Sequence, residues 1–142
     1  MQRSIVRVFC IVCLPFLLTG AGCGDGRVAV EGEVTFDGQP VEKGTIAFEP
    51  ADGAGPMAGG EIQDGRYVLS GDAAVIPGEK IVRITAVRKT GRRLEAGPPE
   101  PPGTMVDELE RYIPPEYNTQ STLTCEITAD GRNQHDFAME SR

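Results

Sequence analysis

Few residues of this chain have types and spacing that could carry chemistry, and Cys23 is the clearest of them. It follows three small residues at positions 20–22, which in turn follow an apolar run. A thiol in this position is a candidate for covalent lipid attachment after cleavage immediately before it. The alternative is ordinary signal-peptide cleavage after Ala21, because Thr19 and Ala21 form the small-x-small pattern that such cleavage prefers.

The segment that places Cys23 has the layout of an export signal. Arg3 and Arg7 precede an apolar stretch over residues 8–18, which is too short for a transmembrane helix of about 20 residues. Residues 20–23 resemble a bacterial lipobox, although Gly20 stands where leucine is preferred. We therefore predict a signal peptide over residues 1–22, lipidation of Cys23 and a flexible tether over residues 23–27. A soluble periplasmic or secreted protein is the alternative.

Two further residues could be reactive, and the pattern around each favours a structural role. His135 is the one histidine of the chain, and its neighbour Asp136 would point to the opposite face of a strand. Cys125 shares the phase of Leu123 and Ile127, which predicts a small buried hydrophobic residue. If Cys23 is not lipidated, it could pair with Cys125 or with another chain.

Acidic residues are numerous but do not form a recognisable site. The Asp-Gly pairs that begin at Asp37, Asp64 and Asp130 are typical of tight turns and lack the spacing of a calcium loop. The chain contains no phosphate-binding loop and no H-E-x-x-H or G-x-S-x-G motif. We expect no catalytic residues, no cofactor and no metal.

The net charge excludes one class of partner. Removal of residues 1–22 takes away Arg3 and Arg7 and no acid, so 12 basic and 21 acidic residues leave a net charge of −9. Nucleic acids select proteins with clustered positive charge. We therefore expect no nucleic-acid partner.

The elements around these residues read as short strands between glycine turns. Apolar residues alternate with polar ones in seven segments, and no helical periodicity of comparable quality occurs. The predicted strands cover residues 28–36, 44–50, 60–63, 66–70, 80–89, 122–128 and 133–140. An all-β antiparallel sandwich over residues 28–140 is the predicted fold.

A proline-rich stretch over residues 90–118 interrupts this pattern. It predicts a long loop with a short helix over residues 104–113, because Thr104 can cap a helix and four apolar residues would share one face. Those residues are Val106, Leu109, Tyr112 and Ile113. Long loops are often functional, and the alternative role is an arm that covers a sheet edge.

The order of the turn motifs resembles a known family. "VEGEVTFDGQPVEKGTIAFEP", "DGRYVL" and "IPGEKIVRITA" resemble carboxypeptidase regulatory-like, or transthyretin-like, domains, and "YIPPEYNTQSTLTCEI" with "GRNQHDFAM" resembles small bacterial secreted lipoproteins built from one such domain. The resemblance implies a seven-stranded Greek-key, prealbumin-like sandwich. It implies little about activity. One branch of the fold hydrolyses 5-hydroxyisourate with several histidines, an arginine and a C-terminal Tyr-Arg-Gly-Ser motif, none of which has an equivalent here.

These observations predict a non-enzymatic lipoprotein of the cell envelope with a structural or protein-interaction role. Its partners would be the membrane, through the lipid anchor, and an unknown envelope protein or glycan. The expected contact residues are Leu109, Tyr112 and Tyr117. The alternative is a carbohydrate- or peptide-binding accessory module, although a chain with three tyrosines and no tryptophan offers little stacking surface for sugars. A hydrolase of unknown substrate is the third hypothesis.

Overall fold

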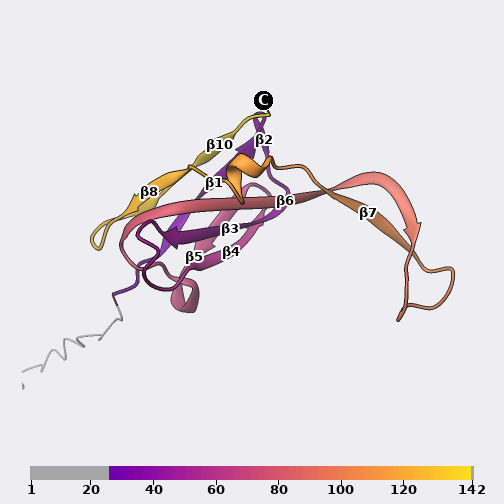
Figure 1. The fold of residues 1–142 in the computed structure, drawn as a ribbon, viewed down its shortest axis with the longest axis horizontal. Coiled ribbons are helices and arrows are strands. Elements are labelled where there is room, and N and C mark those ends of the chain that lie inside the picture. Colours follow the sequence, from indigo (N-terminus) through magenta and orange to yellow (C-terminus); the bar gives the residue numbers. More distant parts are fainter. Residues whose placement is uncertain (1–25, 142) are drawn as a thin grey trace, which may run out of the picture.

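The computed structural model describes residues 26–141, and this part of the chain is all-β (Figure 1). The signal peptide predicted over residues 1–22 and the lipid predicted on Cys23 lie outside these residues. No α-helix occurs within residues 26–141. The elements are β1 (Val30–Phe36), β2 (Gln39–Pro40), β3 (Lys43–Pro50), β4 (Ala58–Gln63), β5 (Arg66–Leu69), the 3-10 turn η1 (Gly71–Ala73), β6 (Gly78–Glu95), β7 (Met105–Arg111), the 3-10 turn η2 (Pro115–Tyr117), β8 (Thr124–Ile127), β9 (Asn133–Gln134) and β10 (Phe137–Met139).

The strands pair in the order β10-β1-β5-β4-β3-β6-β7, while β2 and β9 also pair with β1 and β8 pairs with β6. Most pairs are antiparallel. However, β9 and β10 run parallel to β1, with Val34 opposite Phe137, so the expectation of a wholly antiparallel arrangement is wrong at this edge. The strand predicted over residues 133–140 is split into two, because at His135 and Asp136 the bonding to β1 changes. The His135 N–H donates to the Glu31 carbonyl, and the Asp136 side chain accepts from the Glu33 N–H.

The alternation predicted from the sequence is confirmed in the body of the protein. Val30 and Val34 of β1 are fully buried, as are Val82 and Ile84 of β6. The predicted turns are confirmed as well. At Asp64 and Gly65, between β4 and β5, φ is 50° and 77°, a left-handed pair that suits the tight turn of a hairpin.

The core is formed by buried side chains of β1, β3, β5, β6 and β10, among other elements. Phe48 of β3 contacts Tyr67 of β5, with ring centroids 5.9 Å apart, and Phe137 of β10, at 6.4 Å. Gly32 of β1 is required here, because a Cβ atom at this position would lie 1.8 Å from the His135 carbonyl oxygen. A glycine therefore lets β1 approach the closing segment of the chain.

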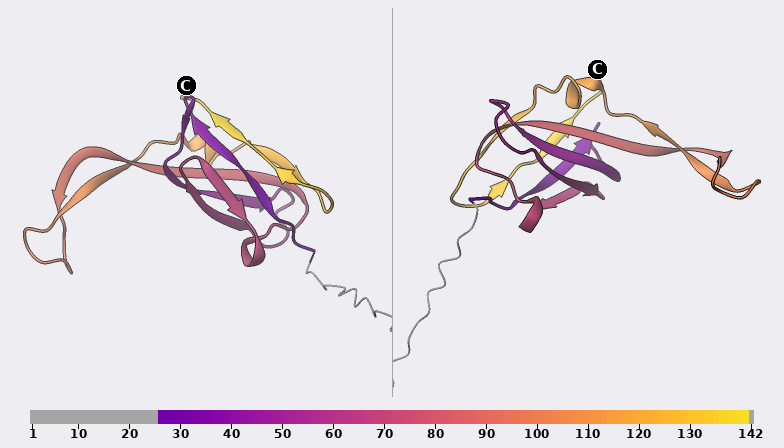
Figure 2. Two further views of the ribbon diagram at one scale, coloured as in Figure 1. Left: turned by 180° about the vertical axis from the view of Figure 1, so that it is seen from behind. Right: turned by 60° about the horizontal axis from the view of Figure 1, so that its bottom comes forward.

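The largest departure from prediction is the segment after Ala86. There β6 leaves β3 and continues to Glu95, where the chain turns and returns as β7. The two strands project as an arm, here defined as residues 87–111, from the rest of the described chain, here called the body (Figures 1 and 2). The predicted helix over residues 104–113 is wrong, since residues 105–111 form β7. The arm itself points away from the body (Figures 1 and 2), whereas residues 113–118 of the same proline-rich stretch lie along β6. Only residues 96–104 at the tip form a proline-rich loop between the two strands.

The reason for this departure is the partner strand. The apolar residues of β7 have helical spacing, but its acidic residues face a basic run in β6. Antiparallel pairing places Arg88 opposite Glu110 and Arg93 opposite Asp107, and cross-strand pairs of opposite charge stabilise a ribbon. A helix would lose these pairs.

Candidate functional site

The arm is held together by charged pairs rather than by a core. Arg88 bonds Glu110 at 2.6 Å, and Lys89 bonds Asp107 at 2.6 Å. The Asp107 carboxylate raises the pKa of Lys89, and the Lys89 ammonium lowers the pKa of Asp107. These pairs bridge β6 and β7, so they fix the register of two strands that bury almost nothing.

Large apolar side chains are exposed on the arm. Leu94 of β6 lies opposite Val106 of β7, and both are more than two-fifths exposed. Met105 and Leu109 are exposed as well, Leu109 at 57%. A two-stranded ribbon is marginally stable without packing, and exposed apolar groups in such an element are typical of a contact surface.

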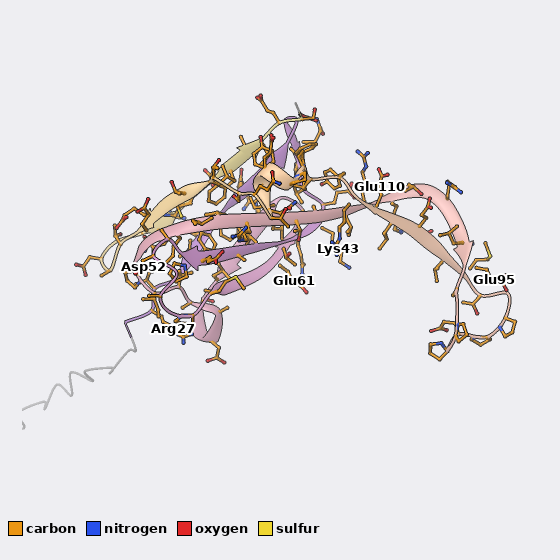
Figure 3. All side chains as sticks on the ribbon, in the orientation of Figure 1. Arg27, Lys43, Asp52, Glu61, Glu95 and Glu110 are labelled. Carbon is orange, nitrogen blue, oxygen red and sulfur yellow. The ribbon has the colours of Figure 1, made fainter. Side chains whose placement is uncertain are left out.

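A groove of about 780 Å³ lies where the arm leaves the body. It forms because the chain before β3 turns inward: Val41 is fully buried, and its N–H donates to the Val34 carbonyl. Figure 3 labels Lys43 and Glu110 near this junction and Glu95 towards the tip. The groove is lined by Phe36, Asp37, Gln39, Pro40, Glu42, Lys43, Val87, Arg88, Lys89, Asp107, Leu109 and Tyr112.

Tyr112 anchors the base of the arm to the body. Its ring meets the Phe36 ring edge-on, with centroids 5.4 Å apart, and the Arg88 guanidinium lies 5.0 Å from its centroid. Partial burial raises the pKa of Tyr112. With Arg88 over one face and Phe36 against the ring, Tyr112 has limited stacking surface left for a sugar.

Of the three predicted contact residues, the structure brings two together. Leu109 and Tyr112 both line the groove, whereas Tyr117 lies in η2, packs against the core and exchanges hydrogen bonds of 3.2 Å with the backbone of Glu140. Sequence reasoning did not single out Phe36, Pro40 or Val87. The signal that could have identified the arm is the match between the basic run in residues 88–93 and the acidic residues of β7.

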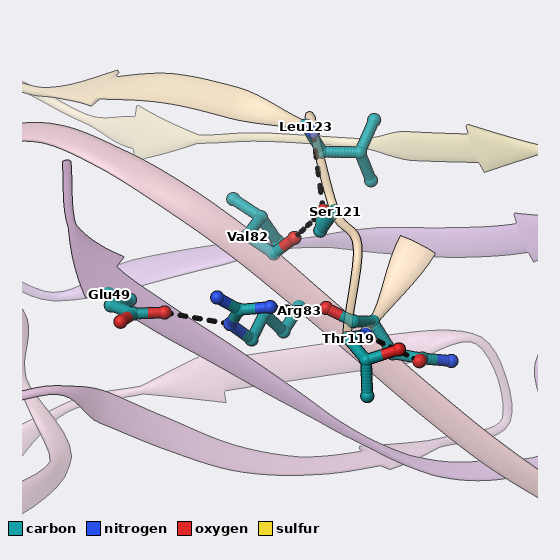
Figure 4. Close-up of polar contacts among 7 residues, drawn as sticks. Glu49, Val82, Arg83, Thr119, Ser121 and Leu123 are labelled. Carbon is teal, nitrogen blue, oxygen red and sulfur yellow. Dashed lines mark hydrogen bonds and ion pairs between the residues drawn. The ribbon is translucent and has the colours of Figure 1, made fainter. Parts of the chain in front are cut away.

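One edge of β6 pairs with β3. The connection from β7 to β8 runs along the other edge. The Ser121 hydroxyl donates to the Val82 carbonyl, the Val82 N–H donates to the Leu123 carbonyl, and Arg83 pairs with Glu49 at 2.7 Å (Figure 4). Residues 113–123 are thus fixed along the body part of β6. This edge is not open to a partner.

The two other candidate reactive residues have structural environments. The phase of Cys125 predicts a buried residue. In the structure Cys125 is only half-buried, although it packs against the core. Burial, with a contribution from Glu126, raises its pKa to about 11, so the thiol form prevails. His135 is half-buried, and its backbone supplies both a donor and an acceptor to neighbouring strands.

Within residues 26–141 no group of three or more His, Cys, Asp and Glu side chains is placed to hold a metal ion. No helix in the same part of the chain is long and apolar enough to cross a bilayer.

Comparisons of the chain with protein-family models, curated proteins and solved structures gave no match.

Proposed function

We propose that this chain is a lipid-anchored, non-enzymatic protein of the cell envelope that uses its arm to contact another envelope component. The observation that carries the proposal is the arm itself, a ribbon with exposed apolar side chains and a groove at its base. A folded body has no need of such a ribbon for its own core. Lipid attachment at Cys23 is the proposed anchor.

The placement of the arm suits this function. Figure 3 places Arg27, the last residue of the proposed tether, at the far end of the body from Glu95. An anchor at Cys23 would therefore hold the body near the membrane and direct the arm outwards. At about 3.3 Å per residue, the nine residues from Val87 to Glu95 reach roughly 30 Å.

We further infer that the body is a Greek-key, prealbumin-like sandwich of the carboxypeptidase regulatory-like type. Strands β4 and β5 share a single register pair, Gln63 with Arg66. This weak junction divides the strands into a group around β1 and a group around β3 and β6. Contacts such as Phe48 with Tyr67 join the two groups face to face, as the two sheets of a sandwich do.

Two measurements test the proposed function. Mass spectrometry of the mature N-terminus is expected to find diacylglycerol on Cys23, and Cys23→Ser is expected to release the protein from the membrane fraction. A photo-crosslinking amino acid at Leu109 is expected to give a discrete adduct in intact cells. The matched control is the same group at Val68, which is 65% exposed on the body. Equal adducts at both positions, or none at Leu109, Leu94 and Val106, would contradict the proposed function.

A further inference from the structure

The proposed tether joins the body at one end, where four segments of the chain lie together. β1 begins where β5 ends and where β9 begins, as the pairs of Val30 with Leu69 and with Asn133 show. β6 begins where β8 ends, with Gly78 opposite Ile127, and β3 ends and β4 begins at this end as well. The four segments that precede or connect these strands are here called the tether end, and they are residues 26–29, 51–57, 70–77 and 128–132.

The last residue of the tether is fixed to this end of the body. The Arg27 guanidinium donates to the Asp72 carbonyl of η1 at 3.1 Å. Next to it, the backbones of Val28 and Val75 exchange hydrogen bonds of 2.8 and 2.9 Å. The point at which the tether joins the body is therefore set by the segment between β5 and β6.

The length of the tether limits how far this end can lie from a bilayer. Four residue steps separate Cys23 from Arg27, and at no more than about 3.6 Å per residue they span at most about 14 Å. A diacylglycerol group on Cys23 places this residue at the level of the lipid headgroups. Arg27 is therefore held within about 14 Å of the headgroups, whatever the conformation of the tether.

The large apolar side chains that the body exposes are concentrated at this end. Within residues 26–141 they are Met57, Val68 and Ile76, and the other exposed ones belong to the arm. Met57 is 62% exposed and Ile76 is 38% exposed, and both belong to the tether end. Val68 lies one residue before the end of β5. Exposed apolar side chains that gather at one place on a surface are typical of an interaction site.

Met57 and Ile76 lie beside the tether. Together with Arg27 they line a hollow of about 370 Å³. Residues 51–57 are all exposed and contain a single charged residue, Asp52, which lies at the same end of the body as Arg27 (Figure 3). Its carboxylate accepts a hydrogen bond of 2.9 Å from the backbone of the same loop. A loop with so little charge can enter the headgroup region at a small desolvation cost.

The charge of the tether end also suits a bilayer better than the rest of the body does. Its four segments hold two arginines, Arg27 and Arg132, and three aspartates, so their net charge is −1. The net charge of residues 23–142 is −9, so most of the negative charge of the body lies elsewhere. Because anionic lipids repel acidic surfaces, the tether end is the part of the body that a bilayer repels least. Its charge does not attract anionic lipids, so apolar contact must supply the interaction.

We propose that the tether end of the body lies on the lipid bilayer, with Met57 and Ile76 inserted at the boundary between headgroups and acyl chains. This inference rests on the proposed function, because the lipid on Cys23 supplies the attachment and the two side chains set the orientation. Since β6 runs from Gly78 at the tether end to Glu95 in the arm, this contact places the arm on the side of the body away from the bilayer.

Methionine oxidation tests the inference in the unsubstituted chain. Met57 and Met105 are both exposed, whereas Met139 is buried and serves as the slow reference. The mature lipidated protein is reconstituted in vesicles of phosphatidylethanolamine and phosphatidylglycerol and treated with chloramine-T, a charged oxidant that stays in water. Mass spectrometry is expected to show slow oxidation of Met57 and rapid oxidation of Met105. In Cys23→Ser, which has no anchor, both should oxidise rapidly.

Tryptophan fluorescence gives an independent readout, because the chain contains no tryptophan. In vesicles, Met57→Trp and Ile76→Trp are expected to emit at shorter wavelength and to lose emission to lipids with brominated acyl chains. Met105→Trp, the same change on the arm, is the matched control and should keep its emission. Addition of Met57→Asp to Ile76→Trp is expected to abolish the quenching, because a carboxylate is costly to insert. Addition of Met105→Asp to Ile76→Trp should leave the quenching unchanged.

Salt distinguishes apolar insertion from adsorption by charge. The protection of Met57 is expected to persist in about 1 M salt, which screens interactions between exposed charges. Loss of the protection in salt would overturn the inference, since it would mean that charged groups hold this end on the headgroups.

The inference is also overturned if Met57 and Met105 oxidise in the same ratio in vesicles as in Cys23→Ser, or if Met57→Trp and Ile76→Trp are not quenched. Equal quenching of Met105→Trp and Met57→Trp would overturn it as well, because the arm would then lie on the bilayer. If Cys23 carries lipid and holds the protein on the membrane but these tests fail, the proposed function stands and only the orientation of the body is wrong. If Cys23 carries no lipid, the proposed anchor is wrong and this inference fails with it.

Discussion

The hydroxyl of Tyr67 donates a hydrogen bond to the backbone carbonyl of His135 at 2.7 Å. The bond joins β5 to the segment between β9 and β10, and it passes over Gly32 of β1, whose missing side chain leaves room for it. Three segments that are distant in sequence therefore meet at one point. This junction closes the body around its core.

Tyr67→Phe is expected to destabilise the protein by about 1–2 kcal/mol, because the change leaves the His135 carbonyl without this donor in a part-buried site. Tyr112→Phe is the matched control, since its hydroxyl makes no hydrogen bond within residues 26–141, and its expected effect is close to zero. Urea denaturation followed by circular dichroism measures both. Equal destabilisation by the two changes would mean that the hydrogen bond contributes nothing specific.

Gly32→Ala is expected to have a larger effect. The added Cβ atom would lie 1.8 Å from the His135 oxygen and 3.0 Å from the Tyr67 ring, so the backbone must move. We expect a loss of about 3 kcal/mol, the upper part of the range for overpacking. Gly97→Ala, at a position with no atom within 4 Å of the added carbon, is expected to change stability little. An equal Tm for the two variants would contradict this account.

The protein is expected to lose stability in alkaline solution. Burial raises the pKa of Cys125 to about 11 and the pKa of Tyr67 above its ordinary value of about 10. Because both groups are neutral when protonated, the stabilisation is complete below the unfolded pKa values and is lost as pH rises through the folded ones. The free energy of unfolding should therefore fall from about pH 9 upwards. The double variant Cys125→Ala and Tyr67→Phe should show a smaller slope, and an unchanged slope would exclude these groups as the cause.

The body is expected to fold without most of the arm. Lys89 and Leu109 are opposite each other, so residues 90–108 can be replaced by Asn-Gly, which forms a two-residue hairpin turn. We expect the free energy of unfolding to change by about 1 kcal/mol or less, because β7 contains no buried residue. Phe48→Ala, a core substitution, should instead cost about 3–5 kcal/mol. A shortened chain that does not fold would show that the arm stabilises the body.

The body of the fold could be predicted because burial imposes a period of two on its strands. Val30 and Val34 in β1, or Val82 and Ile84 in β6, must face the core, so their spacing reports the strand directly. The turns at Asp37 and Asp64 could be predicted for a similar local reason, since they need residues that accept a positive φ.

The arm could not be predicted in this way, because no face of it is buried. Its apolar residues follow no core, so their spacing in β7 does not report its conformation. The information lies in a pairing between residues about 20 positions apart, such as Arg88 with Glu110. The groove residues were missed for the same reason: Phe36 and Val87 are distant in the sequence and line one groove only once the chain has folded. The parallel return of β10 along β1 is also non-local.

The pairing of β1 with β10 affects when the protein can fold. β1 lies at the start of the described chain and β10 near its end, and Val34, Thr35 and Phe36 pair with Phe137, Ala138 and Met139. One edge of β1 therefore has no complete partner strand until residue 139 has been synthesised. If the chain is threaded through a membrane as an unfolded polymer, this late-arriving partner keeps it from closing prematurely. The pairing of residues 137–139 with β1 is then the step after which the chain is folded and can no longer be threaded.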